Sequence, residues 1–430
     1  MIIKELIEKI EGEAELDFIL NKNKIEDVKI KFGLFRGIEN ILIGKAARDA
    51  LVITPRVCGI CNHAHLIAAV RAIEDGYAKS GIKVELSNKA KDIREFTLSC
   101  ELIQNHIKWF YLSILPKLEA LVNEKSGENY GLKASYLSTT ITKALAIFGG
   151  QWPHSSYAVP GGITCDPTYI DIMQAENLLD ESIQFFEKMV IQMPLEEYLA
   201  IDTISSLHKI GGDFGKVLAL MGMHEIANMG QSYDRFIVFS DSILSKSGKS
   251  MATTVFNVDV NYVEESLQKE SMAKAVRYKQ IFYEVGPLAR GMVSKEPIIK
   301  SMHKLYKDSI FTRVFSRVHE IALLLKQNKI LLKSLNLDEP SCTIHKDIKE
   351  LSFEGVGTVE AARGSLIHRT KVEKGYIKSY QIITPTQWNL SNGTKESLGI
   401  AQKAMIGLSD IAVAEFVFKA FDVCSVCTTK

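Results

Sequence analysis

Two C-x-x-C pairs at opposite ends of the chain, Cys58–Cys61 and Cys424–Cys427, constrain its fold more than any other feature. Two thiolates three residues apart can bind a soft metal ion from one turn, so two such turns can supply four sulfur ligands to zinc, an iron–sulfur cluster or nickel. Zinc modules place their pairs about 15 to 20 residues apart, whereas Cys61 and Cys424 are 363 positions apart. A shared metal would therefore join both chain ends at the centre of the fold. A redox disulfide pair and unconnected core cysteines are the alternatives.

The composition excludes several classes of protein. The chain has 430 residues, of which 46% are hydrophobic, so it can bury a large core and is neither a disordered tail nor a disulfide-stapled miniprotein. A formal net charge of +1 gives no electrostatic attraction to nucleic acid or to an acidic membrane. No run reaches the roughly 18 uncharged residues of a membrane helix, and the odd number of cysteines, seven, fits reduced thiols. We expect a cytoplasmic protein, or one associated with a membrane through partner subunits, with no membrane span and no nucleic-acid partner.

The hydrophobic pattern predicts a mainly α fold with small α+β parts. Residues 14–20 and 28–32 alternate with period two around a polar turn, which indicates an N-terminal antiparallel hairpin. Two apolar stripes at helical spacing over residues 94–118 predict a buried helix. Asp166 and Pro167 predict the N-cap and first residue of another helix. Further helices are expected near residues 207–230, 297–334 and 394–421.

The domain organisation is expected to be simple. No repeat, low-complexity tract or linker rich in Ser, Gly or Pro interrupts the sequence, so residues 1–430 should form one integrated domain. Its core should be a large helical bundle, with the metal site joining both chain ends. Residues 234–290 mix strand-like pieces with loops and are predicted to form a smaller α+β excursion.

Several short segments accompany the cysteines. In chain order they are Lys9–Gly12 (KIEG), Phe35–Glu39 (FRGIE), Arg56–Cys61 (RVCGIC) with His65, Ala362–Gly364 (ARG), Tyr380–Asn389 (YQIITPTQWN) and Asp422–Cys427 (DVCSVC). These segments resemble, in the correct order, the words R-I-E-G, F-R-G-x-E, R-x-C-G-x-C, P-R-G, Y-Q-x-x-x-P-[ST]-x-W-N and D-P-C-x-x-C of the large subunit of nickel–iron hydrogenases. The segment from Gln151 to Gly162 is most similar to the uptake and sensory subclasses of that family.

The resemblance implies a nickel–iron centre and its ligands. Cys58 and Cys424 would be terminal thiolates on nickel, and Cys61 and Cys427 would bridge nickel to an iron that carries small diatomic ligands. The preference of soft thiolates for such metals agrees with this assignment. The implied reaction is the reversible heterolytic cleavage of H2 into protons and electrons.

The resemblance also implies catalytic residues near the metals. Glu11 would be the proton-relay carboxylate, since a carboxyl group beside thiolates has a raised proton affinity; the alternative is a solvated acid in the hairpin. Arg363 would lie over the open metal position, and Asp422 would hold its fork of donors; the alternative is a surface loop arginine. Asn105 stands where the family commonly has an aspartate, so one carboxylate around Arg363 is missing.

A second, hard-cation site is implied nearby. Glu39 matches a carboxylate that holds a divalent ion, with the Ile382 carbonyl as a second ligand, which would make a magnesium site. The family usually ends in C-x-x-His, but this sequence ends in Lys430. We expect the Lys430 ammonium to pair with Glu39 in place of the ion, and no tail to be removed after Lys430. His65 is expected to support the bridging sulfur of Cys61.

The remaining histidines and cysteines are assigned as follows. His106 and His154 are expected near the site. His208, His224, His303, His319, His345 and His368 are expected on the surface or in the core. Cys100, Cys165 and Cys342 are expected to be ordinary buried residues.

The sequence therefore predicts the catalytic large subunit of a nickel–iron hydrogenase. After the four ligands only three unclustered cysteines remain, so the electrons need an iron–sulfur small subunit, and a larger heteromer is compatible with this. One alternative is a hydrogen sensor with low turnover. Another is a structural relative without activity, which the presence of all four cysteines disfavours.

Overall fold

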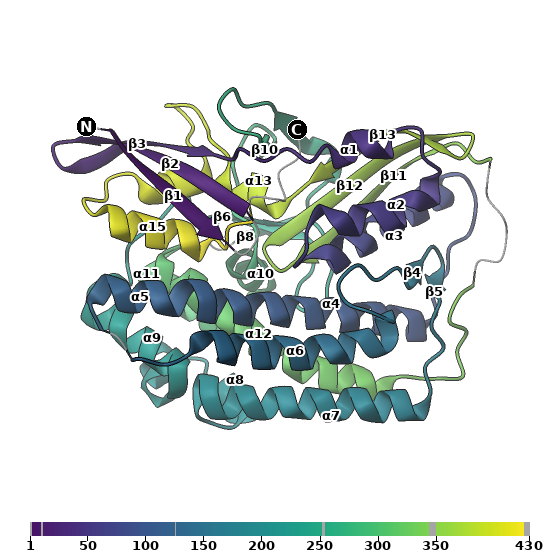
Figure 1. The fold of residues 1–430 in the computed structure, drawn as a ribbon, viewed down its shortest axis with the longest axis horizontal. Helices are drawn as coiled ribbons and strands as arrows, with labels where there is room; N and C mark the ends of the chain where they lie inside the picture. The colour runs from purple at the N-terminus through teal and green to yellow at the C-terminus, as the bar shows by residue number, and fades with distance from the viewer. Residues whose placement is uncertain (1, 10–11, 125, 252–253, 344–349, 425–430) are drawn as a thin grey trace.

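The computed structural model describes the chain except for residues 1, 10–11, 125, 252–253, 344–349 and 425–430. It is mainly helical with several small antiparallel sheets. Long helices form one layer, and two three-stranded sheets lie with shorter helices on the other side of the molecule (Figure 1). The predicted mainly α composition is confirmed.

Four long helices pack against one another in the helical layer. They are α4 (Asn88–Trp109), α6 (Tyr130–Gly149), α7 (Tyr169–Phe185) and α12 (Ile310–Ser334). Helix α4 contacts α6 and α12, and α7 contacts the same two helices. The two apolar stripes of α4 are buried by these neighbours, because a helix that is apolar on both sides needs cover on both sides.

The helix predicted over residues 94–118 extends further at both ends. Ser87 caps it by accepting a hydrogen bond from the Ala90 N–H at 3.0 Å. Helix α4 then continues through a π-helical turn at Phe110–Ile114 into α5 (Leu115–Val122). The π-helical turn shifts the side chains that follow it to a new face of the helix.

The helix predicted to start at Asp166 and Pro167 starts later, at Tyr169. Thr168 is its N-cap and exchanges hydrogen bonds with Asp171 in a capping box, which is the stronger start signal. The segment predicted over 297–334 is two helices, α11 (Pro297–Tyr306) and α12, because Ser309 caps a new start. The remaining helices are α1 (Ile38–Leu42), α2 (Ala50–Ile53), α3 (Asn62–Lys79), α8 (Leu195–Leu199), α9 (Gly212–Met223), α10 (Pro287–Ser294), α13 (Pro385–Leu390), α14 (Ile400–Met405) and α15 (Ile411–Ala420).

The N-terminal sheet has three antiparallel strands: β1 (Ile2–Lys9), β2 (Gly12–Asn21) and β3 (Lys24–Lys31). The expected hairpin corresponds to β2 and β3, in which Phe18 pairs with Val28 and Leu16 with Ile30. These four side chains are fully buried, as the period-two pattern requires. Strand β1 pairs with the other edge of β2 and was not predicted.

A second sheet carries the turn that holds Arg363. Strands β11 (Phe353–Ala361), β12 (Gly364–Glu373) and β13 (Tyr376–Ile383) pair antiparallel in that order. Helix α3 lies directly on β11, and an added Cβ at Gly357 would be 2.0 Å from the Ala68 carbonyl oxygen. Glycine therefore permits this close packing, which places the start of α3 beside the Arg363 turn.

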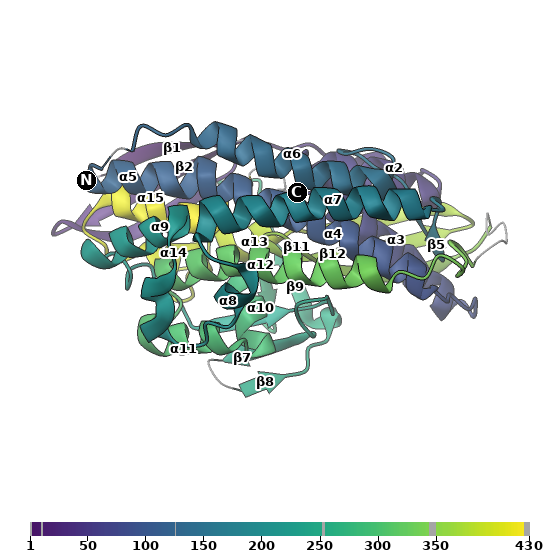
Figure 2. The same ribbon diagram turned by 90° about the horizontal axis from the view of Figure 1, so that it is seen from below.

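Residues 234–286 form strands, one 3-10 turn and loops. Strands β6 (Arg235–Val238), β7 (Gly248–Met251) and β8 (Thr254–Phe256) make one sheet, and β9 (Val263–Ser266) pairs with β10 (Ala275–Tyr278). Strands β7 and β8 project from the helical layer together with α10 and α11 (Figure 2). A two-stranded ribbon of β4 (Ala158–Val159) and β5 (Gly162–Ile163) completes the strands described. The single-domain organisation remains a prediction.

The described helices include none that is both long and apolar enough to cross a membrane.

Candidate metal centre

Three of the four predicted cysteine ligands meet inside the molecule. Cys58 follows a 3-10 turn, Cys61 directly precedes α3, and Cys424 follows α15. The Sγ atoms of Cys58 and Cys424 are 3.6 Å apart, too far for a disulfide bond, and all three thiols are buried in one cluster. Cys427 lies outside the described residues. The two ends of the chain thus come together at a cluster of soft ligands.

Hydrogen bonds fix the turn that carries the first pair. The Ile60 carbonyl accepts from Gln104 Nε2 and from Asn105 Nδ2, both at 2.7 Å. Asn62 Nδ2 donates to the Gly59 carbonyl at 3.2 Å. Two amide side chains of helix α4 therefore hold the backbone between the two cysteines, since buried amide donors must be paired.

Arg363 lies beside the cysteines, and its guanidinium is hydrogen-bonded to Asp422. Its Nη2 donates to Asp422 Oδ1 at 3.0 Å, its Nε donates to the Asp422 carbonyl at 2.9 Å, and its Nη1 donates to Asn105 Oδ1 at 3.3 Å. Burial opposes the charge, but Asp422 and then Cys424 and Cys61 raise the pKa of Arg363 well above its ordinary value. Arg363 is thus a buried, permanent cation, not a surface loop residue. The Asn105 amide links it to the Cys58–Cys61 turn, a contact the sequence did not predict.

His65 lines the same small cavity as Cys61 and Arg363. Its Nδ1 is 3.1 Å from His368 Nε2, and His368 Nδ1 is 2.9 Å from the Tyr380 hydroxyl. Burial lowers the pKa of His65 to about 4 and lowers that of His368. His65 is therefore neutral and is oriented by its contact with His368. The sequence had predicted only that His368 lies on the surface or in the core.

Glu101 is a buried acid near the cysteines that the sequence analysis missed. Its carboxylate accepts hydrogen bonds from the N–H groups of His63 and Ala64, at 2.7 and 2.9 Å, at the start of α3. Burial raises its pKa to about 8. Its place on a buried face of α4 was the only available signal.

Glu39 is paired with Lys274, a residue that the sequence did not single out. Lys274 Nζ lies 3.1 and 3.3 Å from its two carboxylate oxygens and 3.4 Å from Glu265. The Ile382 N–H donates to Glu39 Oε1 at 2.7 Å. Lys430 lies outside the described residues, so its pairing with Glu39 stays a prediction; within the described residues the ammonium on Glu39 is that of Lys274.

The other predicted residues are distributed around the site. His106 lies 2.8 Å from Glu320 and 3.2 Å from Arg317, which contacts Asp422. The His154 N–H donates to Asn62 Oδ1 at 2.9 Å. Glu11 and His345 lie outside the described residues. Cys100 is buried, whereas Cys165 and Cys342 are only half-buried.

Comparison with known proteins decides the family. The family profile described as "Nickel-dependent hydrogenase" matches residues 36–125, 122–273 and 246–429. The chain belongs to this family. It is thereby the large subunit of a hydrogenase, as the sequence predicted, and an enzyme that acts on hydrogen.

Similar hydrogenases match over nearly their whole length. The periplasmic [NiFeSe] hydrogenase large subunit of Desulfomicrobium baculatum is 27% identical, over 93% of this chain and 88% of that protein. The sulfhydrogenase 1 subunit alpha of Pyrococcus furiosus is 26% identical, over 98% of this chain and 96% of that protein. The reduced Ni-Fe-Se hydrogenase from D. vulgaris Hildenborough has the same fold, with a TM-score of 0.84 at 21% identity and full coverage of both chains.

Proposed function

We propose that this hydrogenase large subunit holds a nickel–iron centre on Cys58, Cys61, Cys424 and Cys427. The first and third would be terminal ligands of nickel, and the second and fourth would bridge it to an iron with diatomic ligands. The observation that carries the proposal is the meeting of three buried thiols from distant parts of the chain. A thiolate-rich donor set fits soft metals. When bound, the metals supply the heterolytic cleavage of H2 and accept its electrons.

The chain's own residues would orient the reactants and move the proton. Arg363 keeps a fixed positive charge at the cavity that Cys61 and His65 also line. Hydrogen bonds to Asp422 and Asn105 fix the orientation of the Arg363 guanidinium. His65, neutral at ordinary pH, would donate toward the sulfur of Cys61. Glu11 would take the proton and pass it toward the surface, a role that rests on the resemblance of the KIEG segment.

We propose an iron–sulfur small subunit as the electron-transfer partner, within a cytoplasmic or partner-anchored heteromer. Beyond the four proposed ligands the sequence has three cysteines, Cys100, Cys165 and Cys342, which are not clustered along the chain. We place the proposed docking surface at the segment that leads to Cys58. Its exposed apolar side chains are Leu34, Phe35, Ile41, Ile43 and Val52. Exposed apolar side chains of this kind would be covered by the partner on docking.

At Glu39 the contacts favour an ammonium over magnesium. A divalent ion at Glu39 and the Ile382 carbonyl would have to displace Lys274, which already contacts both carboxylate oxygens. Magnesium also needs near-octahedral oxygen ligands. We propose that Lys274 supplies the positive charge that Glu39 requires.

Hydrogen-dependent reduction of an artificial electron acceptor tests the proposed activity. The large subunit, purified with its small subunit, should sustain many turnovers, and Cys58→Ala should abolish them together with nickel binding. Turnover near zero with nickel present would favour the hydrogen-sensing alternative. No turnover and no nickel would indicate a structural relative.

A further inference from the structure

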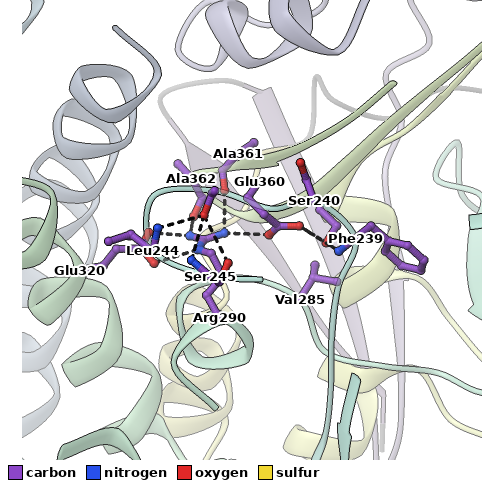
Figure 3. A network of polar contacts seen from close by, with 12 residues as sticks. Phe239, Ser240, Leu244, Ser245, Val285, Arg290, Glu320, Glu360, Ala361 and Ala362 are labelled. Atoms are coloured by element: carbon purple, nitrogen blue, oxygen red, sulfur yellow. Dashed lines mark hydrogen bonds and ion pairs between the residues drawn. The ribbon is translucent and has the colours of Figure 1, made fainter. Parts of the chain in front are cut away.

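The turn that ends in Arg363 is held by a buried guanidinium from another part of the chain. Arg290 on α10 donates from Nη1 to the Ala361 carbonyl at 3.0 Å and to Glu360 Oε2 at 3.1 Å. Its Nε and Nη2 donate to Glu320 at 2.8 and 2.6 Å. Figure 3 shows Arg290 between the two glutamates, facing the backbone of Ala361 and Ala362.

A second guanidinium, that of Arg317 on α12, contacts the same turn. Its Nη1 lies 3.1 Å from the Ala362 carbonyl, 3.2 Å from Asp422 Oδ2 and 3.2 Å from His106 Nδ1. Asp422 is therefore shared, with Oδ2 on Arg317 and Oδ1 on Arg363. Arg317 thus contacts both supports of Arg363, namely the preceding residue and the paired carboxylate.

The hydrogen bonds fix the protonation state of His106. A guanidinium has only donors, so His106 Nδ1 accepts from Arg317. The proton is then on Nε2, which donates to Glu320 Oε1 at 2.8 Å. Burial lowers the pKa of His106 to about 4, in agreement with a neutral ring. His106 therefore connects Arg317 to the Glu320–Arg290 pair without adding charge.

The network is balanced in charge. It joins three basic groups, Arg290, Arg317 and Arg363, to three acidic groups, Glu320, Glu360 and Asp422, and all six side chains are buried. Burial lowers the pKa of Arg317 to about 10, which still leaves it charged at neutral pH. Removing one member of a buried pair leaves an uncompensated charge, which is far more costly than losing a surface pair.

We propose that Arg317 is a positioning residue for Arg363: it fixes the Asp422 carboxylate and the Ala362 carbonyl so that the Arg363 guanidinium points at the cysteine cluster. The proposal rests on the proposed role of Arg363 in turnover. Neutralising Arg317 should free Asp422 Oδ2 and loosen the turn, so Arg363 should lose its direction while the cysteines keep their places.

The test compares Arg317→Met with a matched control, Arg94→Met, in the complex with the small subunit. Arg94 is also a buried arginine that pairs with a glutamate, Glu74, and holds a loop carbonyl, that of Gly162. Both variants should lower the thermal midpoint. Both variants should retain nickel and iron. Only Arg317→Met should lose at least ten-fold in turnover.

A double-mutant cycle with Arg363→Lys separates positioning from general stability. If Arg317 acts through Arg363, adding Arg317→Met to Arg363→Lys should lower turnover by less than about two-fold. An equal fold-loss in both backgrounds would overturn the proposal. If the methionine variant does not fold, Arg317→Gln, which keeps an amide donor but loses the charge, takes its place in the cycle with the same expected and contradicting results.

A crystal structure of the Arg317→Met complex gives a readout that does not depend on activity. The Arg363–Asp422 pair should separate beyond hydrogen-bond distance, while the Arg94→Met structure should keep the pair. An unchanged pair would refute the positioning role even if turnover fell. A wild-type complex without hydrogen turnover would instead contradict the proposed function, and the structures would still test whether Arg317 holds the pair.

Discussion

At the scale of single residues, Arg363 shows how a buried cation is made permanent and directional. Asp422 accepts hydrogen bonds from Arg363 with both its side-chain carboxylate and its backbone carbonyl. Asp422 itself adopts a left-handed backbone conformation with φ of 60°. Aspartate tolerates that conformation better than most residues do. The backbone thus turns after α15 so that one residue can hold Arg363 and lead directly to Cys424.

Arg363→Lys should leave nickel and iron content unchanged and lower hydrogen turnover by at least ten-fold, about 1.4 kcal/mol of barrier. A lysine keeps the charge but loses the planar fork that meets Asp422 and Asn105 together. Metal analysis and turnover of the same preparation check this. Unchanged turnover would return Arg363 to a structural role.

Lys274→Met should leave the negative charge of Glu39 uncompensated, so that another cation can bind there. The variant leaves Glu39 and Glu265 close together without their shared ammonium, so its thermal midpoint should fall. Added magnesium should raise the midpoint of the variant and leave that of the wild type unchanged. Magnesium bound at one equivalent to the wild type would contradict the assignment.

Glu11→Gln should retain both metals and slow hydrogen/deuterium exchange, because an amide cannot carry the proton. The matched control is Glu13→Gln, a change two positions along the chain. Exchange at the wild-type rate in Glu11→Gln would remove Glu11 from the proton path.

At the scale of elements, the close approach of β11 to α3 determines where the site residues lie. Strand β11 leads into the Arg363 turn, and α3 begins directly after Cys61. Gly355 and Gly357 both face α3, where an added Cβ would lie 1.9 or 2.0 Å from a helix carbonyl oxygen. The glycines therefore couple the position of the arginine to that of the cysteine.

Gly357→Ala should destabilise the protein, since the backbone of β11 or α3 must shift; overpacking of this kind costs about 1–3 kcal/mol. Gly222→Ala is the control, because nothing lies within 4 Å of the added Cβ there. Thermal unfolding should show a lower midpoint for Gly357→Ala only. Equal midpoints would mean that the strand can move away from the helix without cost.

Helices could be predicted from the sequence where the hydrophobic periodicity was strong. Their ends could not be predicted where a capping residue or a distant partner determines the boundary. The stripes over 94–118 identified a buried helix, but its length depends on the Ser87 cap and on the π-helical turn after Trp109. The start at Tyr169 was missed because Asp166 and Pro167 also fit a cap, and only the mutual bonds of Thr168 and Asp171 decide between them.

At the scale of the whole molecule, the fold brings distant segments to one buried centre. The two cysteine pairs could be predicted to meet because thiolate ligands act together, and the structure places Cys58 against Cys424. Lys274 could not be predicted as the partner of Glu39, since it lies 235 positions away and no local pattern links them. Arg317 likewise stands in a helix whose sequence shows only its periodicity. Partners that depend on tertiary packing are therefore the ones that sequence analysis missed.

Metal analysis of the purified complex tests the central claim most directly, because the cysteines from both chain ends should together hold nickel and iron. The large subunit should contain close to one nickel and one iron beyond those of the small subunit, and Cys61→Ala should lose both metals. One zinc per chain with no nickel would contradict the account.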